Sequence, residues 1–204
     1  FSKALEKFKY IIYNNPGSLI AMNSQLYLAE SLFNLEKYDQ ASKEYDRYIL
    51  VSQDSQGVEK AKFFICKCFF KLSSSYKKDQ EASYIAIDRM QYFIEQYPNS
   101  QFSSECNVMI TELRSKLAKK DLESGKLYLR IEEFPSAIVY FNSVIRDYYD
   151  TEYYETAIIN LILTYVLNGE IALADNTFNQ YKDDLQNKDN YIAAKNILTK
   201  EHNV

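Results

Sequence analysis

Few side chains of this sequence have the chemistry that catalysis requires. The only histidine, His202, lies at the very end of the chain, and we interpret it as a residue of a frayed tail. The adjacent carboxylates Asp183-Asp184 and Glu132-Glu133 fit solvated charge pairs better than acid–base machinery. The sequence contains no glycine-rich phosphate loop and no nucleophile motif. An enzyme is therefore the least favoured function, and no catalytic residue is predicted.

The three cysteines do not form a recognisable metal or disulfide pattern. Cys66 and Cys68 are two residues apart on a predicted helix, so their side chains point to different faces. A structural zinc site needs about four ligands at ordered spacings, and the third cysteine, Cys106, is far away in the sequence. We predict that all three are small core residues and that the chain binds no metal and no cofactor.

The alternative to catalysis is binding, and one candidate binding surface lies near the start of the chain. Four polar side chains share one face of a helix predicted at about 19–35, namely Asn23, Tyr27, Glu30 and Asn34. Their amides and phenol could hydrogen-bond the backbone of an extended peptide. The alternative, given equal weight, is that they are only the polar side of an amphipathic helix.

A second candidate surface is rich in tyrosine. Its residues crowd one predicted corner between helices, namely Tyr140, Arg146, Asp147, Tyr148, Tyr149, Tyr153 and Tyr154. Several of these side chains should lie in the core. The exposed ones would form an aromatic and arginine-bearing patch of the kind that anchors protein interfaces. We predict a partner interface there, with plain packing as the alternative.

Helices must position these groups, and one stretch shows how the helices pair. It reads Gly125-x-x-Tyr128, then Phe134, then Ala137-x-x-x-Phe141, which matches the tetratricopeptide (TPR) pattern. A glycine inside a helix costs about 1 kcal/mol relative to alanine. Gly125 in an apolar helical pattern therefore indicates close packing, with Ala137 fitting opposite on the next helix.

The same spacing recurs along the chain. The interval from the small residue of the first helix to the alanine of the second is 12 residues at 29–41, 125–137 and 162–174. The alanines themselves repeat after 37 residues between Ala4 and Ala41 and between Ala137 and Ala174. The other two intervals between successive alanines of this pattern are longer than 37 residues, because each contains an insertion. The first insertion is a polar connection at 73–79, and the second, between Ser100 and Gly125, predicts one long helix.

The fold class that follows is all-α, a right-handed TPR superhelix of about five repeats whose first repeat is truncated. We divide it into an N-terminal half, 1–98, and a C-terminal half, 99–204. Asn168-Gly169 should form the turn of the last repeat, which spans about 151–186. Helices are predicted at about 1–14, 19–35, 38–52, 57–72, 80–97, 101–131, 135–148 and 189–200, the last capping the apolar end of the array.

Composition excludes some functions. The 204 residues carry a net charge of −4, which disfavours nucleic acid as a partner. No run of about 18 apolar residues occurs, so no membrane-spanning helix is predicted. Because Phe1 falls inside the second helix of a repeat, we expect the native chain to begin upstream of it.

One further pattern is more specific than a TPR array. Tyr97-Pro98-Asn99-Ser100-Gln101-Phe102 opens the long helix, and Leu113-x-x-x-Leu117-Ala118-Lys119 continues it. The stretch from Gly125 to Phe141 follows, and then Val144-Ile145-Arg146-Asp147-Tyr148-Tyr149-Asp150-Thr151. This order resembles the BamD family, the TPR lipoproteins of the outer-membrane β-barrel assembly machine, over nearly the whole chain. Two features depart from the family. Tyr149 replaces its usual proline, and the lipid-bearing cysteine is not in this sequence.

The resemblance implies a non-enzymatic scaffold at the periplasmic face of the outer membrane, held there by an N-terminal lipid. The C-terminal repeats would bind the periplasmic POTRA domains of BamA, and the N-terminal groove would bind unfolded β-barrel precursors. Other Bam lipoproteins stay open as further partners. The alternative is another periplasmic TPR adaptor, in envelope division or cell-wall coordination. A cytoplasmic co-chaperone ranks third, because Glu30 does not suit its basic carboxylate clamp.

Overall fold

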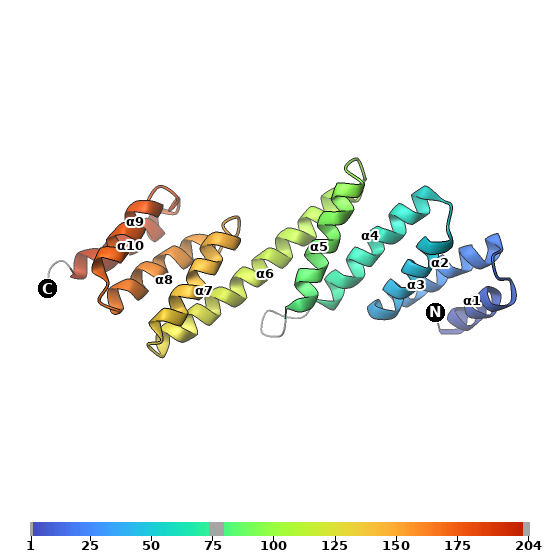
Figure 1. Ribbon diagram of the computed structural model, residues 1–204, viewed down its shortest axis with the longest axis horizontal. Helices are drawn as coiled ribbons and strands as arrows, with labels where there is room; N and C mark the ends of the chain where they lie inside the picture. Colours follow the sequence, from blue (N-terminus) through green and yellow to red (C-terminus); the bar gives the residue numbers. More distant parts are fainter. Residues whose placement is uncertain (1, 74–79, 202–204) are drawn as a thin grey trace. The chain divides into compact units, whose positions relative to one another are not determined.

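The computed structural model describes residues 2–73 and 80–201, and these residues form ten helices and no strand (Figure 1). The predicted polar connection at 74–79 and His202 lie outside the described residues. The helices are α1 (Ser2–Asn14), α2 (Leu19–Asn34), α3 (Tyr38–Val51), α4 (Ser55–Leu72), α5 (Glu81–Gln96), α6 (Ser103–Arg130), α7 (Phe134–Asp147), α8 (Tyr154–Leu167), α9 (Ile171–Tyr181) and α10 (Lys188–Glu201).

Short polar and glycine signals begin and end these helices. The Ser18 hydroxyl accepts a hydrogen bond from the Ala21 amide at 3.2 Å and caps α2. Gly169 has a φ of +77° in the turn after α8, the left-handed conformation in which glycine ends helices without strain. The equivalent turns after α2 and α6 place Glu36 and Glu132 at φ of 59° and 60°, so these two residues carry backbone strain.

Helices that follow one another in the sequence pack against one another. Contacts join α1 to α2, α2 to α3, α3 to α4 and α4 to α5, then α7 to α8 and α8 to α9, while α10 packs on α8 and α9. This sequential packing is that of a TPR-like solenoid, so the predicted all-α class is confirmed. No described helix is both long and apolar enough to cross a membrane.

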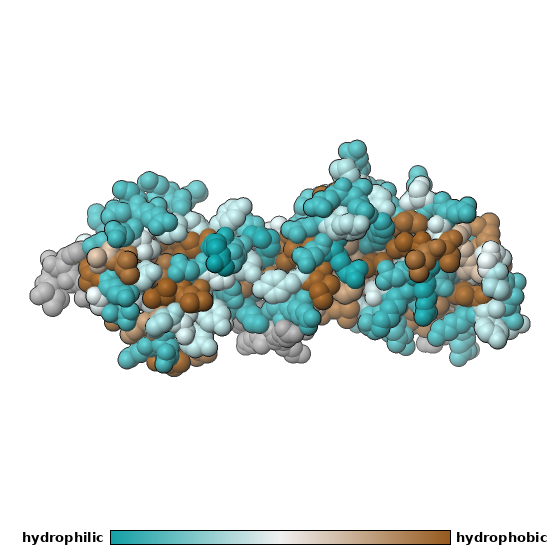
Figure 2. All heavy atoms as spheres, in the orientation of Figure 1, coloured by the Kyte–Doolittle hydropathy of each residue, from teal (hydrophilic) through white to brown (hydrophobic). Residues whose placement is uncertain are grey.

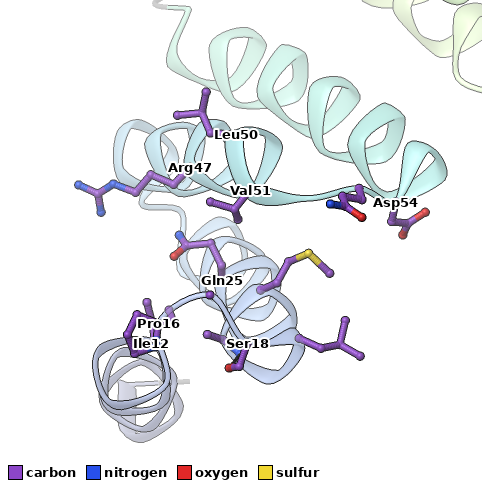
Figure 3. Close-up of a pocket in the computed structure, with 13 residues that line it drawn as sticks. Ile12, Pro16, Ser18, Gln25, Arg47, Leu50, Val51 and Asp54 are labelled. Carbon is purple, nitrogen blue, oxygen red and sulfur yellow. Dashed lines mark hydrogen bonds between the residues drawn. The ribbon is translucent and has the colours of Figure 1, made fainter.

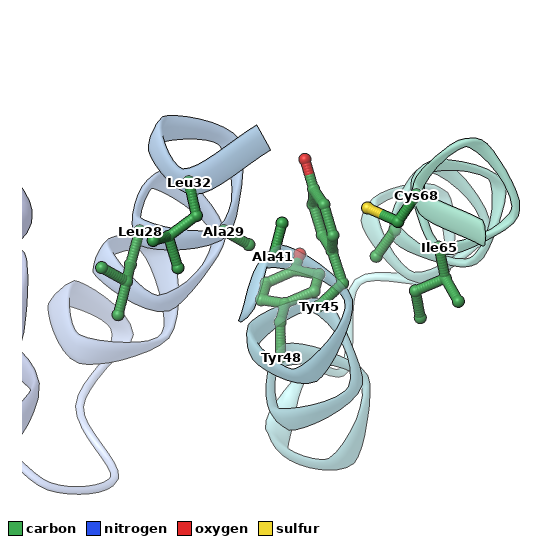
Figure 4. Packing of buried hydrophobic residues seen from close by; sticks show 9 residues of the cluster. Leu28, Ala29, Leu32, Ala41, Tyr45, Tyr48, Ile65 and Cys68 are labelled. Atoms are coloured by element: carbon green, nitrogen blue, oxygen red, sulfur yellow. The ribbon is translucent and has the colours of Figure 1, made fainter. Parts of the chain in front are cut away.

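The chain forms two compact units, Phe1–Leu113 (unit 1) and Arg114–Val204 (unit 2), with the boundary inside α6. The core of unit 1 is built where small residues let helices approach. Ala29, Ala41 and Ala61 are fully buried on α2, α3 and α4. Larger side chains fill the space around them, including Leu28, Leu32, Tyr45, Tyr48, Ile65 and Cys68 (Figure 4).

Unit 2 confirms the packing role predicted for Gly125. A Cβ atom at this position would lie 2.6 Å from the ring of Phe141, and Ala137 and Phe141 are both fully buried. The last repeat repeats the arrangement with Ile162 and Ala174, which are also fully buried.

The capping helix is also present. On α10, Ala194 and Leu198 are buried, and the Tyr191 ring lies 5.6 Å from that of Phe178 on α9. This packing shields the apolar side of the last repeat.

Candidate functional site

The first candidate surface occupies one face of α2. Asn23 and Asn34 are exposed, and Tyr27 keeps 52% of its surface accessible. The Tyr27 ring also stacks on Phe8 of α1, with ring centroids 5.8 Å apart and planes at 29°. The predicted residues therefore do share one face, but Tyr27 contributes to packing as well as to the surface.

Glu30 is less available than the sequence suggests. Its carboxylate accepts a hydrogen bond from the Lys60 ammonium of α4 at 2.9 Å. The same ammonium lies 5.7 Å from the centre of the Phe64 ring, a cation–π distance. The ion pair thus joins the first helices of two successive repeats.

Three α4 side chains extend this face, and the sequence analysis missed them. Lys67 forms an ion pair of 2.9 Å with Glu105 of α6 and lies 5.6 Å from the same Phe64 ring. Lys60, Phe64 and Lys67 follow a spacing of four and three residues, which places them on one helix face; this spacing is the signal that could have found them. We call the combined set of Asn23, Tyr27, Glu30, Asn34, Lys60, Phe64 and Lys67 the α2–α4 surface.

One buried polar atom lies in the core that α2, α3 and α4 share. The Tyr45 side chain is fully buried, and its hydroxyl has no hydrogen-bond partner among the described residues. Burial, with the Glu30 charge as a second cause, raises the pKa of Tyr45. Figure 4 shows the Tyr45 ring standing between α2 and α4. The phenol is therefore neutral and contributes no charge to the α2–α4 surface.

The tyrosine-rich set of unit 2 divides into core and surface residues. Tyr148 is buried, as is its neighbour Val144. Tyr140 is half-buried and stacks on Tyr128, with centroids 5.4 Å apart and planes at 11°. Tyr148, and in part Tyr140, therefore serve packing.

The exposed residues of this set surround the end of α7. The Arg146 side chain is 76% exposed and pairs with the Asp147 carboxylate at 2.7 Å. Hydrogen bonding from Arg146 lowers the pKa of Asp147. Tyr149 is 67% exposed. These side chains offer one cation and one free phenol ring to a partner.

Tyr149 and Tyr154 also line a polar hollow of about 540 Å³. The Tyr154 hydroxyl donates to the Asp184 carboxylate at 2.9 Å, and burial, followed by this hydrogen bond, raises the pKa of Tyr154. Tyr153 is half-buried at the start of α8. The structure brings Tyr149 and Tyr154 together, whereas Tyr140 does not line the hollow. We call Arg146, Asp147, Tyr149 and Tyr154 the α7–α8 corner.

An unpredicted arginine fixes this corner. Arg114 of α6 donates to both carboxylate oxygens of Asp150, through Nη2 at 2.6 Å and Nε at 2.9 Å, and to the Asp147 carbonyl at 2.7 Å. These hydrogen bonds lower the pKa of Asp150. No local motif could have revealed this contact, because Arg114 precedes Asp150 by 36 residues.

A second hollow, of about 790 Å³, lies in unit 1 and was also missed. The end of α1, the start of α2 and the end of α3 surround it, and Ile12, Leu50 and Val51 make it largely apolar (Figure 3). Leu50 is 83% exposed, and Figure 2 shows brown, apolar surface over the region that α2 and α3 occupy in Figure 1. The sequence analysis did not predict this hollow, because it interpreted Leu50 and Val51 only as part of the end of a helix.

No group of three or more potential metal ligands occurs among residues 2–73 and 80–201. The three cysteines are buried free thiols, as the prediction of small core residues required.

Comparison with known proteins identifies the family. A family model described as YfiO, outer membrane lipoprotein, matches residues 1–182. The chain is 25% identical over 169 residues to outer membrane protein assembly factor BamD of Rickettsia prowazekii (strain Madrid E), covering 83% of this chain and 67% of that protein.

Two further relatives carry the same name. Over 169 residues the chain is 22% identical to BamD of Caulobacter vibrioides (strain ATCC 19089 / CIP 103742 / CB 15), covering 83% of this chain and 55% of the relative. The BamD of Buchnera aphidicola subsp. Acyrthosiphon pisum (strain APS) is 22% identical over 171 residues, covering 79% and 69%. The resemblance to BamD is thereby confirmed, and the chain belongs to the YfiO family of outer membrane lipoproteins.

Proposed function

We propose that this protein is a non-enzymatic scaffold of outer-membrane protein assembly, held by a lipid at the periplasmic face of the outer membrane. Unit 1 presents the α2–α4 surface to extended segments of unfolded β-barrel precursors. Unit 2 binds the periplasmic POTRA region of BamA through the α7–α8 corner. Membership in an outer membrane lipoprotein family and the names of the relatives support the role in assembly.

The observation that carries the first half is the composition of the α2–α4 surface. An extended segment has backbone N–H and C=O groups that need partners when they leave water. The exposed amides of Asn23 and Asn34 can donate and accept at once. Between them, the half-exposed Tyr27 ring offers apolar contact to alternate side chains. Such a surface suits many sequences, as a binder of precursors requires.

Fluorescence anisotropy with a labelled barrel-precursor peptide tests this half. Replacing Tyr27 and Asn34 together with alanine should raise the Kd roughly tenfold. Because Tyr27 stacks on Phe8, a Tyr27→Phe variant keeps the ring and separates packing from the hydroxyl. The matched control is Tyr13→Ala with Asn99→Ala, two exposed positions elsewhere in unit 1. Equal affinities for the double variant and the control would reject the surface.

The second half depends on an exposed cation beside an exposed aromatic ring. Arg146 and Tyr149 are of the residue types that dominate interface energetics. Reversing the charge with Arg146→Glu should abolish capture of purified BamA POTRA domains in a pull-down. The control is Arg130→Glu, an equal charge change at an exposed position of the same unit. Capture at the wild-type level by Arg146→Glu would reject the α7–α8 corner.

A further inference from the structure

Within unit 1, α4 lies alongside the start of α6 through a row of side-chain contacts. Three pairs make up this row: the Ser100 hydroxyl donates to Glu59 at 2.5 Å, the rings of Phe63 and Phe102 stack at 4.3 Å and 11°, and Lys67 pairs with Glu105 at 2.9 Å. Both members of each pair advance along the sequence together. The two segments therefore run parallel at close distance.

Two of the three cysteines, Cys66 and Cys106, lie beside this row. Cys66 lies between Phe63 and Lys67 on α4, and Cys106 follows Glu105 on α6. The Cys66 thiol donates to the Arg89 carbonyl oxygen at 3.5 Å, and the Cys66 and Cys106 thiols are near enough that each shifts the pKa of the other. They are 2% and 0% exposed, respectively. Both thiols are thus enclosed, and the stacked rings and the ion pair hold the two segments together next to them.

The third cysteine is excluded from this pair by helix geometry. Cys68 is two residues beyond Cys66, so it faces another side of α4. It is fully buried in the core that contains Ala41 and Tyr45, and Figure 4 shows its sulfur directed toward Tyr45. The odd number of cysteines therefore resolves into one facing pair and one solitary core residue.

We propose that Cys66 and Cys106 are a modification site, at which an oxidant of the disulfide class joins α4 to α6 through a disulfide. The oxidant is available to the protein in the compartment of the proposed function, because extracytoplasmic compartments of bacteria sustain disulfides. The bond closes a loop between residues 40 positions apart. It would hold the first helices of two successive repeats together, next to the α2–α4 surface.

The reaction is a pair of thiol–disulfide exchanges. One thiolate of the Cys66–Cys106 pair attacks one sulfur of the oxidant disulfide, forming a mixed disulfide and releasing one thiolate. The other cysteine then loses its proton and attacks the sulfur of the first cysteine, which releases the second thiolate of the oxidant. In total the two cysteines lose two protons and two electrons, and the oxidant disulfide becomes two thiols.

In the folded protein the neighbouring Cys106 thiol and burial raise the pKa of Cys66, which keeps this thiol protonated and unreactive. Because neither sulfur is accessible in the folded protein, the exchange requires an open state. We therefore expect the bond to form while unit 1 folds, and slowly in protein that is already folded.

The test uses the reduced, unfolded full chain, refolded in a buffer of oxidised and reduced glutathione. Free thiols are alkylated, and peptides are identified by mass spectrometry. The expected product is a single peptide pair linking Cys66 to Cys106, with Cys68 alkylated. The linked protein should melt roughly 5–10 °C higher than its dithiothreitol-reduced form, because the cross-link restricts the unfolded chain.

Variants keep the test decisive. Cys68→Ala should still give the linked peptide, and Cys106→Ser should give none. Alkylation of both Cys66 and Cys106 in refolded wild-type protein, or a link that includes Cys68, would overturn the proposal. The readout is independent of the proposed function, since it needs neither a precursor peptide nor POTRA domains.

Discussion

The two units use their charged side chains in different ways. In unit 1, ion pairs join helix to helix, as Glu30–Lys60 and Lys67–Glu105 do between successive first helices. In unit 2, Arg114 joins a helix to the turn that contains Asp150. Helix-to-helix pairs leave a long, regular face open, whereas helix-to-turn contacts fix the shape of one corner. The first arrangement suits an extended ligand, and the second suits a folded one.

Unit 2 contains a second contact of this helix-to-turn kind, near its C-terminal end. The Glu155 carboxylate accepts hydrogen bonds from the backbone amides of Gln186 at 3.1 Å and Asn187 at 3.3 Å, and from the Asn190 side chain at 2.8 Å. One carboxylate on α8 thus holds the connection between α9 and α10. The loops of unit 2 are held by side chains distant in sequence, which gives a folded partner a defined surface.

The largest expected loss of stability comes from a steric clash placed in unit 2 alone. Gly125→Leu would drive a side chain into Phe141, whose ring lies 2.6 Å from the Cβ position. We expect unit 2 to lose about 3 kcal/mol of stability or more, while unit 1 keeps its hydrogen-exchange protection. Glu123→Leu, at an exposed position of the same helix, is the control. Equal loss of protection in both units would show that they do not respond separately.

The second effect concerns the corner itself. Arg114→Ala removes the hydrogen bonds from this side chain to Asp150 and to the Asp147 carbonyl at the end of α7. Because the Asp150 side chain is partly exposed, solvent screens the ion pair, and we expect a loss of roughly 1–2 kcal/mol of stability. Amide exchange at 147–151 should accelerate, and binding of POTRA domains should weaken. Arg130→Ala, at an exposed position of α6, should change neither measurement.

The same contacts make the stability of the corner in unit 2 sensitive to acid. Arg114 lowers the folded-state pKa of Asp150, and Arg146 lowers that of Asp147. A depressed carboxyl pKa contributes stability above the unfolded value, near 4, which is lost as the pH falls through the folded value. Burial raises the pKa of Asp46 in unit 1 and of Asp121 in unit 2, so protonation of these two carboxyls favours the folded state, and the acid-sensitive contacts are those at the end of α7.

Hydrogen exchange between pH 5 and pH 3 measures this difference. The α7–α8 region should lose protection as the pH falls, and more in the wild type than in Asp150→Asn, which lacks the titrating group. If unit 1 loses protection first, the assignment of the acid-sensitive contacts to unit 2 is wrong.

The architecture was predictable from the sequence because its determinants are local. The spacing of Gly125, Ala137 and Phe141 reflects one pair of helices, and a helix face follows directly from positions such as Asn23 and Tyr27. The partners that cross between repeats were not predictable. Lys60 contacts Glu30 although they are 30 residues apart, and Asp150 contacts Arg114 although they are 36 residues apart. Such contacts depend on the stacking of repeats and on side-chain reach, which no short motif encodes.

The smallest expected change in stability concerns a type of turn that occurs in both units. Glu36 in unit 1 and Glu132 in unit 2 adopt the left-handed conformation that Gly169 adopts without strain. Glu36→Gly and Glu132→Gly should therefore each stabilise their own unit, by roughly 0.5–1 kcal/mol. Thermal unfolding of each variant, compared with Glu133→Gly just beyond the strained residue, provides the measurement. A loss of stability in both would show that the surrounding turn, rather than φ, decides.

The central claim is that two surfaces on two units bind two different kinds of ligand. Its most direct test measures both affinities, for a barrel-precursor peptide and for POTRA domains, in the Tyr27→Ala/Asn34→Ala and Arg146→Glu variants. The account predicts a reciprocal pattern, in which the first variant loses only the peptide and the second loses only the POTRA domains. Loss of both ligands in one variant, with the fold intact, would contradict it.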